Sequence, residues 1–267
     1  MARDAEYFDN FYSNIVESPS SDRIVAEALG LPPDLQATGN LPWAAIDDIV
    51  AVLVVDVGAV LVDLGCGRGG YGIEVVRRTG TRLLGVDFSA VALTQARSDA
   101  DAANLAARTE FRLGDLQATG LDDASVDAIM CIDTIQFADS TVGALVECQR
   151  ILRPGGRVVL TWWEPRTRGD PSFPPSLRDL DVETALRQAD FNDVCVVERS
   201  DWQAAERAMW TAAADIEPDE HDEALRDLQD EAQRVLPLLD ATRRLAGQAT
   251  APSTDQRALD ERLDRHP

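Results

Sequence analysis

Apolar runs and amphipathic segments alternate through the middle of the chain and predict a regular succession of strands and helices. Segments with helical periodicity lie at about residues 69–78, 90–105 and 140–152. Short apolar strands separated by amphipathic helices are typical of a mostly parallel sheet with helices on both faces. The pattern therefore predicts an α/β fold. The expected strands are Val60–Leu64, Arg82–Asp87, Thr109–Leu113, Val126–Cys131 and Arg157–Trp163.

The first of these strands ends in a cluster of glycines. Gly65, Gly67 and Gly69 follow it at two-residue spacing, and Asp63 lies two residues before the first glycine. Glycines let the backbone approach a ligand closely, and the helix that follows offers unpaired N–H groups. Gly70 also completes the dinucleotide pattern Gly-x-Gly-x-x-Gly, so the glycines alone do not separate the two ligand classes. The carboxylate of Asp63 favours a cationic amino-acid end over a pyrophosphate.

Two further acidic residues stand at the ends of the next strands. Asp87 lies about 20 residues past the glycine turn, where a carboxylate can accept hydrogen bonds from ribose hydroxyls. Phe88 follows it and can lie against an adenine ring. Asp115, followed by Leu116, ends the third strand, where its carboxylate can accept a hydrogen bond from a ligand. Asp is disfavoured in strands, so this succession of strand-end acids indicates a ligand site.

The glycine stretch with its preceding acid resembles motif I of the class I S-adenosylmethionine-dependent methyltransferases. Residues 126–137 resemble motif IV of the same family, and the turn Leu152-Arg-Pro-Gly-Gly156 is frequent in it. The resemblance covers about residues 60–163. It implies a Rossmann-like, seven-stranded, mostly parallel sheet whose last strand is antiparallel. It also implies S-adenosylmethionine as cofactor, bound by Asp63, Gly65, Gly67, Gly69, Asp87, Phe88, Asp115, Leu116 and Cys131.

Segments outside this region are expected to be mostly helical. We expect helices at about 4–18, 20–29 and 42–55, and at about 202–214 and 219–236. The sixth strand is expected at 193–199 and the seventh at 243–250, although its Ala-Gly-Gln sequence is a poor strand former. This predicts a helical lid over residues 1–56, a methyltransferase domain over 57–252 with a helical insertion at 201–237, and a tail over 253–267.

The first helix carries aromatic residues at three- and four-residue spacings. Such a face either packs on the domain or acts as a lid. In many small-molecule methyltransferases an N-terminal helix covers the cofactor and an aromatic hydroxyl touches its methionine end. The resemblance therefore implies Tyr7 and Tyr12 as cofactor contacts.

Carboxylates are the candidates for catalysis, because the chain has only two histidines, His221 and His266. Asp133 follows the fourth strand and is expected to contact the substrate or act as a base, with a helix-cap role as the alternative. Glu164 follows the fifth strand and is the second candidate. Trp162 and Trp163 alternate, so one is expected to face the core and the other the pocket.

Composition limits the kinds of molecule that the protein is expected to bind. The formal net charge of −22 opposes binding to nucleic acid or to an anionic membrane surface. No apolar run reaches the length of a membrane span, and no signal-peptide pattern opens the chain. The four cysteines form no Cys-x-x-Cys pair and no zinc set, which suits a reduced, cytoplasmic protein without a metal. A homodimer through the added helices is compatible with the sequence.

These expectations converge on an S-adenosylmethionine-dependent methyltransferase that acts on a small organic molecule, such as a specialised metabolite, by direct in-line transfer. The fourth strand is not followed by the Asn-Pro-Pro-Tyr or Asp-Pro-Pro-Tyr sequence associated with methylation of DNA bases or protein glutamine. A non-methylating protein that keeps the fold and cofactor site, as a binding module or another catalyst, is the alternative. An NAD-dependent oxidoreductase is a third possibility that Asp63 opposes.

Overall fold

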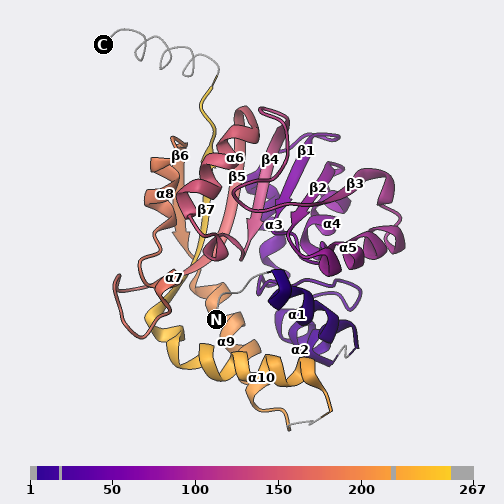
Figure 1. The fold of residues 1–267 in the computed structure, drawn as a ribbon, viewed down its shortest axis with the longest axis vertical. Coiled ribbons are helices and arrows are strands. Elements are labelled where there is room, and N and C mark those ends of the chain that lie inside the picture. The colour runs from indigo at the N-terminus through magenta and orange to yellow at the C-terminus, as the bar shows by residue number, and fades with distance from the viewer. Residues whose placement is uncertain (1–4, 18–19, 218–220, 254–267) are drawn as a thin grey trace.

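A seven-stranded sheet forms the centre of the molecule (Figure 1). The computed structural model describes residues 5–17, 20–217 and 221–253. None of the helices within these residues is both long enough and apolar enough to span a lipid bilayer. The strands are β1 (Val60–Leu64), β2 (Arg82–Asp87), β3 (Thr109–Leu113), β4 (Val126–Ile132), β5 (Leu152–Pro165), β6 (Asn192–Glu198) and β7 (Thr242–Thr250).

The order of the strands determines where a ligand can bind. They run β3-β2-β1-β4-β5-β7-β6 across the sheet, parallel to one another except β7, which is antiparallel to both of its neighbours. The chain adds β2 and β3 on one side of β1 and then crosses to place β4 on the other side. The strand order thus reverses between β1 and β4. Crevices at the carboxyl ends of strands at such a point are the usual ligand sites of open α/β sheets.

Helices cover both faces of the sheet and bury two apolar cores. Alternation along β1 directs Leu61 into one core and Val62 into the other, and both are fully buried. The first core receives α3 (Ala45–Leu53), α4 (Gly70–Thr79) and α5 (Ala90–Ala102). The second receives α6 (Thr141–Ile151) and α8 (Val182–Gln188). This two-sided burial explains the almost continuously apolar strands of the sequence.

A separate group of helices packs together at the carboxyl edge of the sheet (Figure 1). It consists of α1 (Ala5–Glu17), α2 (Ser20–Leu29), α9 (Ser200–Ala214) and α10 (Glu223–Val235). Helix α2 packs against α9, and α10 packs against α1, α2 and α9. Segments from the two ends of the chain therefore form one helical cap, with Leu29, Met209 and Trp210 buried where they join the first core. Short helical turns complete the described chain: η1 (Ala106–Arg108), η2 (Ile135–Phe137), α7 (Pro175–Arg178) and η3 (Leu236–Ala241).

The predicted elements are present, with two informative differences. Strand β5 begins at Leu152 rather than Arg157, because Leu152 pairs with Val126 across a register shift. Strand β7 is regular despite its Ala-Gly-Gln sequence. A side chain at Gly247 would come within 2.8 Å of the Trp162 ring, so the glycine makes room for a buried tryptophan beside the strand. The predicted tail from residue 254 lies outside the described residues.

Candidate active site

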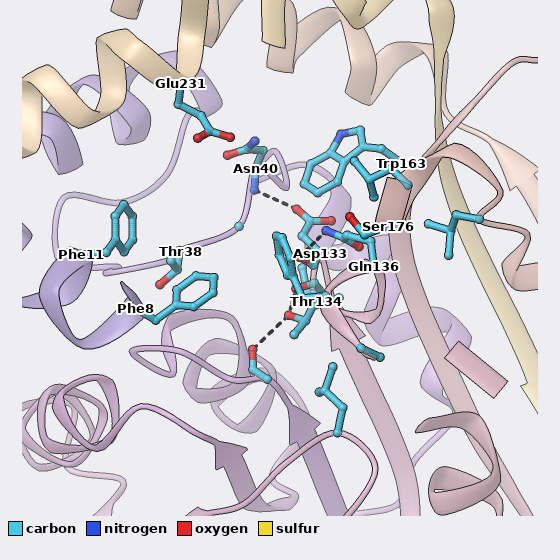
Figure 2. A pocket seen from close by; sticks show the side chains of 18 of the residues that line it. Phe8, Phe11, Thr38, Asn40, Asp133, Thr134, Gln136, Trp163, Ser176 and Glu231 are labelled. Atoms are coloured by element: carbon cyan, nitrogen blue, oxygen red, sulfur yellow. Dashed lines mark hydrogen bonds between the residues drawn. The ribbon is translucent and has the colours of Figure 1, made fainter. Parts of the chain in front are cut away.

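One large cavity lies between the carboxyl ends of the strands and the helical cap (Figure 2). Its volume is about 1680 Å³, against roughly 300–1,000 Å³ for pockets that hold one small ligand. The cavity therefore has room for a cofactor and a second small molecule together. We call one part the glycine-loop end, lined by Asp63, Gly65, Asp87, Phe88, Asp115 and Leu116. We call another the Glu206 end, lined by Asn40, Asp133, Gln136, Trp163 and Glu206.

The glycine loop adopts left-handed backbone conformations that favour glycine. Gly65, Gly67 and Gly69 have φ angles of 72°, 51° and 79°. A side chain at Gly65 would overlap Thr134, whose hydroxyl donates a 3.2 Å hydrogen bond to the Gly65 carbonyl (Figure 2). At Gly67 a Cβ atom would lie 2.7 Å from the Tyr12 hydroxyl. The loop thus packs between the end of β4 and α1. Gly65 lines the cavity, whereas Gly67 and Gly69 do not.

Two buried carboxylates stand beside this loop. Asp63 is 3% exposed and lies against Gly72 in the first turn of α4. Burial, and secondarily the charge of Asp87, raise the pKa of Asp63 to about 7. Asp87 accepts hydrogen bonds from the backbone N–H groups of Gly67 and Ser89 at 2.8 and 2.9 Å. Burial raises the pKa of Asp87 as well, against the opposing effect of those hydrogen bonds.

Aromatic side chains from α1 cover the glycine-loop end. The Phe8 ring lies 5.4 Å from that of Phe88 and 5.8 Å from that of Phe137, both edge to face. Tyr12 is buried, and burial raises the pKa of its hydroxyl well above the usual value. Tyr7 also lines the cavity but is 38% exposed. The first helix therefore lines this end of the cavity with its aromatic side chains, and its role as a lid stays a prediction.

The remaining predicted cofactor residues differ in their access to the cavity. Asp115 and Leu116 line it, and Asp115 is an exposed side chain that accepts a 2.8 Å hydrogen bond from the Gln117 N–H. Cys131 is fully buried in the second core and does not line the cavity. Burial raises the pKa of its thiol well above the ordinary value.

Asp133 lines the Glu206 end and is held by several partners. Its Oδ1 accepts a hydrogen bond from the Thr161 hydroxyl at 2.5 Å and forms a 2.6 Å ion pair with the fully buried guanidinium of Arg244. Its Oδ2 accepts from the Asn40 N–H at 2.8 Å (Figure 2). Its backbone is left-handed, with φ 57°. The short helix that follows has no side-chain cap, so the helix-cap alternative for Asp133 is not what the structure shows.

Glu164 does not line the cavity. It accepts a 3.0 Å hydrogen bond from the Trp162 indole and pairs with Arg243 on the neighbouring strand. Alternation explains its position, because β5 continues to Pro165 and places Glu164 on the same face as Trp162. Trp163 faces the cavity instead, which confirms that the two tryptophans point to opposite sides.

Glu206 was not among the predicted site residues, yet it faces the cavity from α9. It is 1% exposed and accepts hydrogen bonds from the Trp163 indole at 2.6 Å and the Trp210 indole at 3.1 Å. The Asn40 side-chain amide donates to it at 3.3 Å, so Asn40 bridges Asp133 and Glu206. Burial raises the pKa of Glu206, while Arg244 and the two indoles act in the opposite direction.

The sequence contains two charged residues at otherwise apolar positions that indicate this end of the cavity. Glu206 stands four residues after Trp202 and four before Trp210, on the apolar face of α9. Arg244 interrupts the apolar positions of β7. A charged residue at a buried position of a periodic element needs a partner or a ligand. Within the described residues, no group of three or more His, Cys, Asp or Glu side chains is arranged to hold a metal ion.

Comparison with known proteins identifies the class. Residues 62–160 match the family model described as a methyltransferase domain. Part of the chain is 38% identical over 111 residues to demethylmenaquinone methyltransferase of Deinococcus radiodurans, covering 41% of this chain and 45% of that one. It is 32% identical over 99 residues to a sterol 24-C-methyltransferase of Gibberella zeae, covering 37% and 26%. The chain thus spans between about a quarter and a half of these relatives.

Residues 62–160 thus carry a methyltransferase domain, and the matches support the resemblance to the class I S-adenosylmethionine-dependent methyltransferases that the motifs predicted. A solved structure of the [4+2]-cyclase SpnF shares the fold with a TM-score of 0.70 at 21% identity, covering 93% of this chain and 96% of that one. A geranyl diphosphate methyltransferase in complex with geranyl diphosphate and sinefungin follows with a TM-score of 0.65 at 18% identity, covering 79% and 78%. The Rossmann-like fold and S-adenosylmethionine as the cofactor are both confirmed.

Proposed function

We propose that the protein transfers the methyl group of S-adenosylmethionine to a small organic molecule, such as a specialised metabolite, by direct in-line displacement. The main support is that the chain contains a methyltransferase domain whose glycine loop and strand-end acids line one cavity. That cavity has room for two ligands. Relatives that match part of the chain are named for methylation of small molecules, including demethylmenaquinone and 27-O-demethylrifamycin SV.

The glycine-loop end fits the cofactor. We assign Asp63 to the cationic amino end, because its buried carboxylate has a raised pKa that a nearby cation would lower. We assign Asp87 to the ribose, and Phe88, Asp115 and Leu116 to the adenine. Tyr12 and the loop glycines shape the wall beside them. When bound, the cofactor supplies a methyl group already activated by a sulfonium, so the protein must mainly orient the acceptor and exclude water.

The Glu206 end is assigned to the acceptor. Asp133 contacts or orients the acceptor there, with its carboxylate fixed by Asn40, Thr161 and Arg244. Glu164 is given no role at the acceptor, because it does not line the cavity. An easily deprotonated acceptor needs no base, since proximity alone provides a large part of the rate.

A second function is a non-methylating catalyst that keeps the cofactor site. The observation in its favour is that the fold of a [4+2]-cyclase covers nearly the whole of both chains. The oxygens of Asp133 are also occupied by protein donors, which suits shaping of a substrate more than proton removal. On this proposal the cavity would orient an acceptor without consuming the cofactor.

The experiment is transfer of labelled methyl from S-adenosylmethionine into an extract of the source organism, sorted by molecular size. Label in small molecules, with S-adenosylhomocysteine formed, supports methyl transfer. Cofactor binding without label or S-adenosylhomocysteine supports the second function. Label in nucleic acid or protein contradicts the small-molecule proposal, which rests partly on the net charge of −22. Binding of NAD in place of S-adenosylhomocysteine contradicts both functions.

The same charge supports the proposal that neither nucleic acid nor an anionic membrane is a partner, and we propose a cytoplasmic location. A homodimer through the cap helices remains a proposal that light scattering tests directly.

A further inference from the structure

Negative charge is in excess around the cavity. The arginines in its described lining are Arg68, Arg168 and Arg234. Each already forms an ion pair with an acid of the same lining: Arg68 with Asp22, Arg168 with Asp181, and Arg234 with Glu231. The other lining carboxylates therefore have no cation of the lining left to neutralise them. Side chains of the lining would therefore repel an anionic acceptor more than they would attract it.

The excess of negative charge matters most at the Glu206 end, because the charged groups there are buried. Asp133 and Glu206 are 6% and 1% exposed, and Arg244, whose guanidinium acts on both carboxylates, is fully buried. Arg244 forms its ion pair with Asp133 and lies over the Trp163 ring at 4.2 Å. Two carboxylates thus share one cation, and an uncompensated buried charge is costly.

A separate observation concerns the amide of Gln136, which is 4% exposed and lines the same end. Its Nε2 donates a 2.6 Å hydrogen bond to the Asp133 carbonyl, which fixes the orientation of the amide (Figure 2). Its Oε1 is buried and finds no hydrogen-bond partner among residues 5–17, 20–217 and 221–253. A buried acceptor without a donor is costly, so this oxygen is suited to a ligand that brings a donor.

We propose that the Glu206 end is a subsite for a protonated amino group of the acceptor, held by the Glu206 carboxylate and the Gln136 carbonyl oxygen. An ammonium offers three N–H donors and one positive charge. It balances the surplus carboxylate and supplies the donor that Gln136 lacks. The Trp163 and Trp210 indoles and the Asn40 amide hold Glu206 in place. The inference rests on the proposed function, since it names the class of acceptor for that site.

Three probes of similar size and different charge test the subsite: 2-phenylethylammonium, 2-phenylethanol and 3-phenylpropanoate. Each is titrated calorimetrically into the whole protein near neutral pH, with and without saturating S-adenosylhomocysteine. We expect the ammonium to bind at least about tenfold more tightly than the alcohol, the scale of a charge-assisted hydrogen bond, and the carboxylate to bind weakest. Equal binding of the alcohol, tighter binding of the carboxylate, or no binding of the ammonium overturns the proposal.

Variants assign the preference to the named residues. Glu206→Gln should reduce the preference for the ammonium to about threefold or less, while Asp139→Asn should keep it, because Asp139 is an exposed acid of the lining. Should Glu206→Gln fail to fold, Gln136→Leu serves in its place and should weaken ammonium binding by about threefold to tenfold. An unchanged preference in the folded variant contradicts the assignment. Amine selectivity without methyl transfer would defeat the proposed function and leave the subsite standing.

Discussion

The two ends of the cavity differ in how the chain builds them. The glycine-loop end is assembled from consecutive strands, so that Asp63, Asp87 and Asp115 meet because parallel strands end at the same edge. The Glu206 end joins distant segments: Asn40 bonds to Asp133 across 93 positions and to Glu206 across 166. A site built from consecutive elements appears in the sequence as a motif. A site built by tertiary packing appears only as isolated charged residues within apolar patterns.

The two ends also neutralise their carboxylates differently. At the glycine-loop end, backbone N–H groups of the loop and of the α5 cap hold Asp87. At the Glu206 end, the buried side chain of Arg244 is the cation shared by Asp133 and Glu206. Backbone donors are present whatever the side chains are, but a single guanidinium can be removed by one substitution. The Glu206 end should therefore be the more fragile of the two.

The largest effect is expected from Arg244→Met. The substitution leaves Asp133 buried without its ion-pair partner, and breaking a buried pair costs about 3–5 kcal/mol. Urea denaturation measures the loss in free energy of unfolding. Arg207→Met is the matched control, because Arg207 pairs with Asp240 at the surface and should cost about 0–1 kcal/mol. Similar losses in the two variants would contradict the special role of Arg244.

A second test acts on the glycine-loop end. Gly65→Ala introduces a side chain at φ 72° that overlaps Thr134, so strain and overpacking should cost about 2–4 kcal/mol and weaken cofactor binding. Gly155→Ala is the control, because Gly155 has φ 76° but open space around it. It should cost about 1 kcal/mol and leave affinity for S-adenosylhomocysteine unchanged. Equal effects would mean that backbone strain, not close packing of the loop, matters at Gly65.

Sequence patterns predicted the glycine-loop end because its residues stand at recognisable positions, directly at or after the ends of apolar strands. An Asp at the end of an apolar strand is costly without a reason, and three in succession indicated a ligand site at that edge of the sheet. The class of ligand followed from Asp63 and from the resemblance to a known family. The fold was predictable on the same ground, since strand and helix periodicities do not depend on distant contacts. The regular β7 was harder to predict, because Gly247 makes sense only once Trp162 is beside it.

The Glu206 end was not predicted because no short motif contains it. Asp133 was expected at the pocket from its place after β4, and one of Trp162 and Trp163 from their alternation along β5. The partners of Asp133 and Trp163, Arg244 and Glu206, come from β7 and α9. Glu164 was chosen as the residue after a strand, whereas the strand continues past it and turns its side chain away. Strand boundaries are set by tertiary pairing, here with Arg243, which the sequence of β5 does not contain.

A third prediction uses the raised pKa of Asp63. Without cofactor, the folded protein keeps this proton up to a pKa of about 7, whereas the unfolded chain loses it near 3.8. The folded state therefore binds more protons in that window, and its stability falls as the pH rises from about 4 to about 7. If Asp63 receives the cationic end of the cofactor, affinity for S-adenosylhomocysteine should rise with pH, by at most about tenfold per unit below 7.

Asp63→Asn is the control for this pH dependence. The amide does not titrate, so the contribution of residue 63 to the pH dependence of stability and of affinity should vanish. The contribution of Asp87, whose pKa is also raised, should remain. Calorimetric titration between about pH 5 and 8 measures the affinity, and thermal unfolding over the same range measures the stability. A variant that keeps the full slope of the wild-type protein would show that Asp63 does not hold the cationic end.

The smallest effect is expected where α1 meets the glycine loop. Tyr12→Phe removes a buried hydroxyl that lies close to Gly67, and should weaken binding of S-adenosylhomocysteine by about 0.5–1.5 kcal/mol, the net value of one hydrogen bond. Tyr7→Phe alters a hydroxyl on a side chain that is 38% exposed, and a smaller change, within about 0.5 kcal/mol, is expected. A larger loss from Tyr7→Phe would exchange the roles of the two tyrosines. It would also place the cofactor contact of the lid at the exposed rather than the buried side of α1.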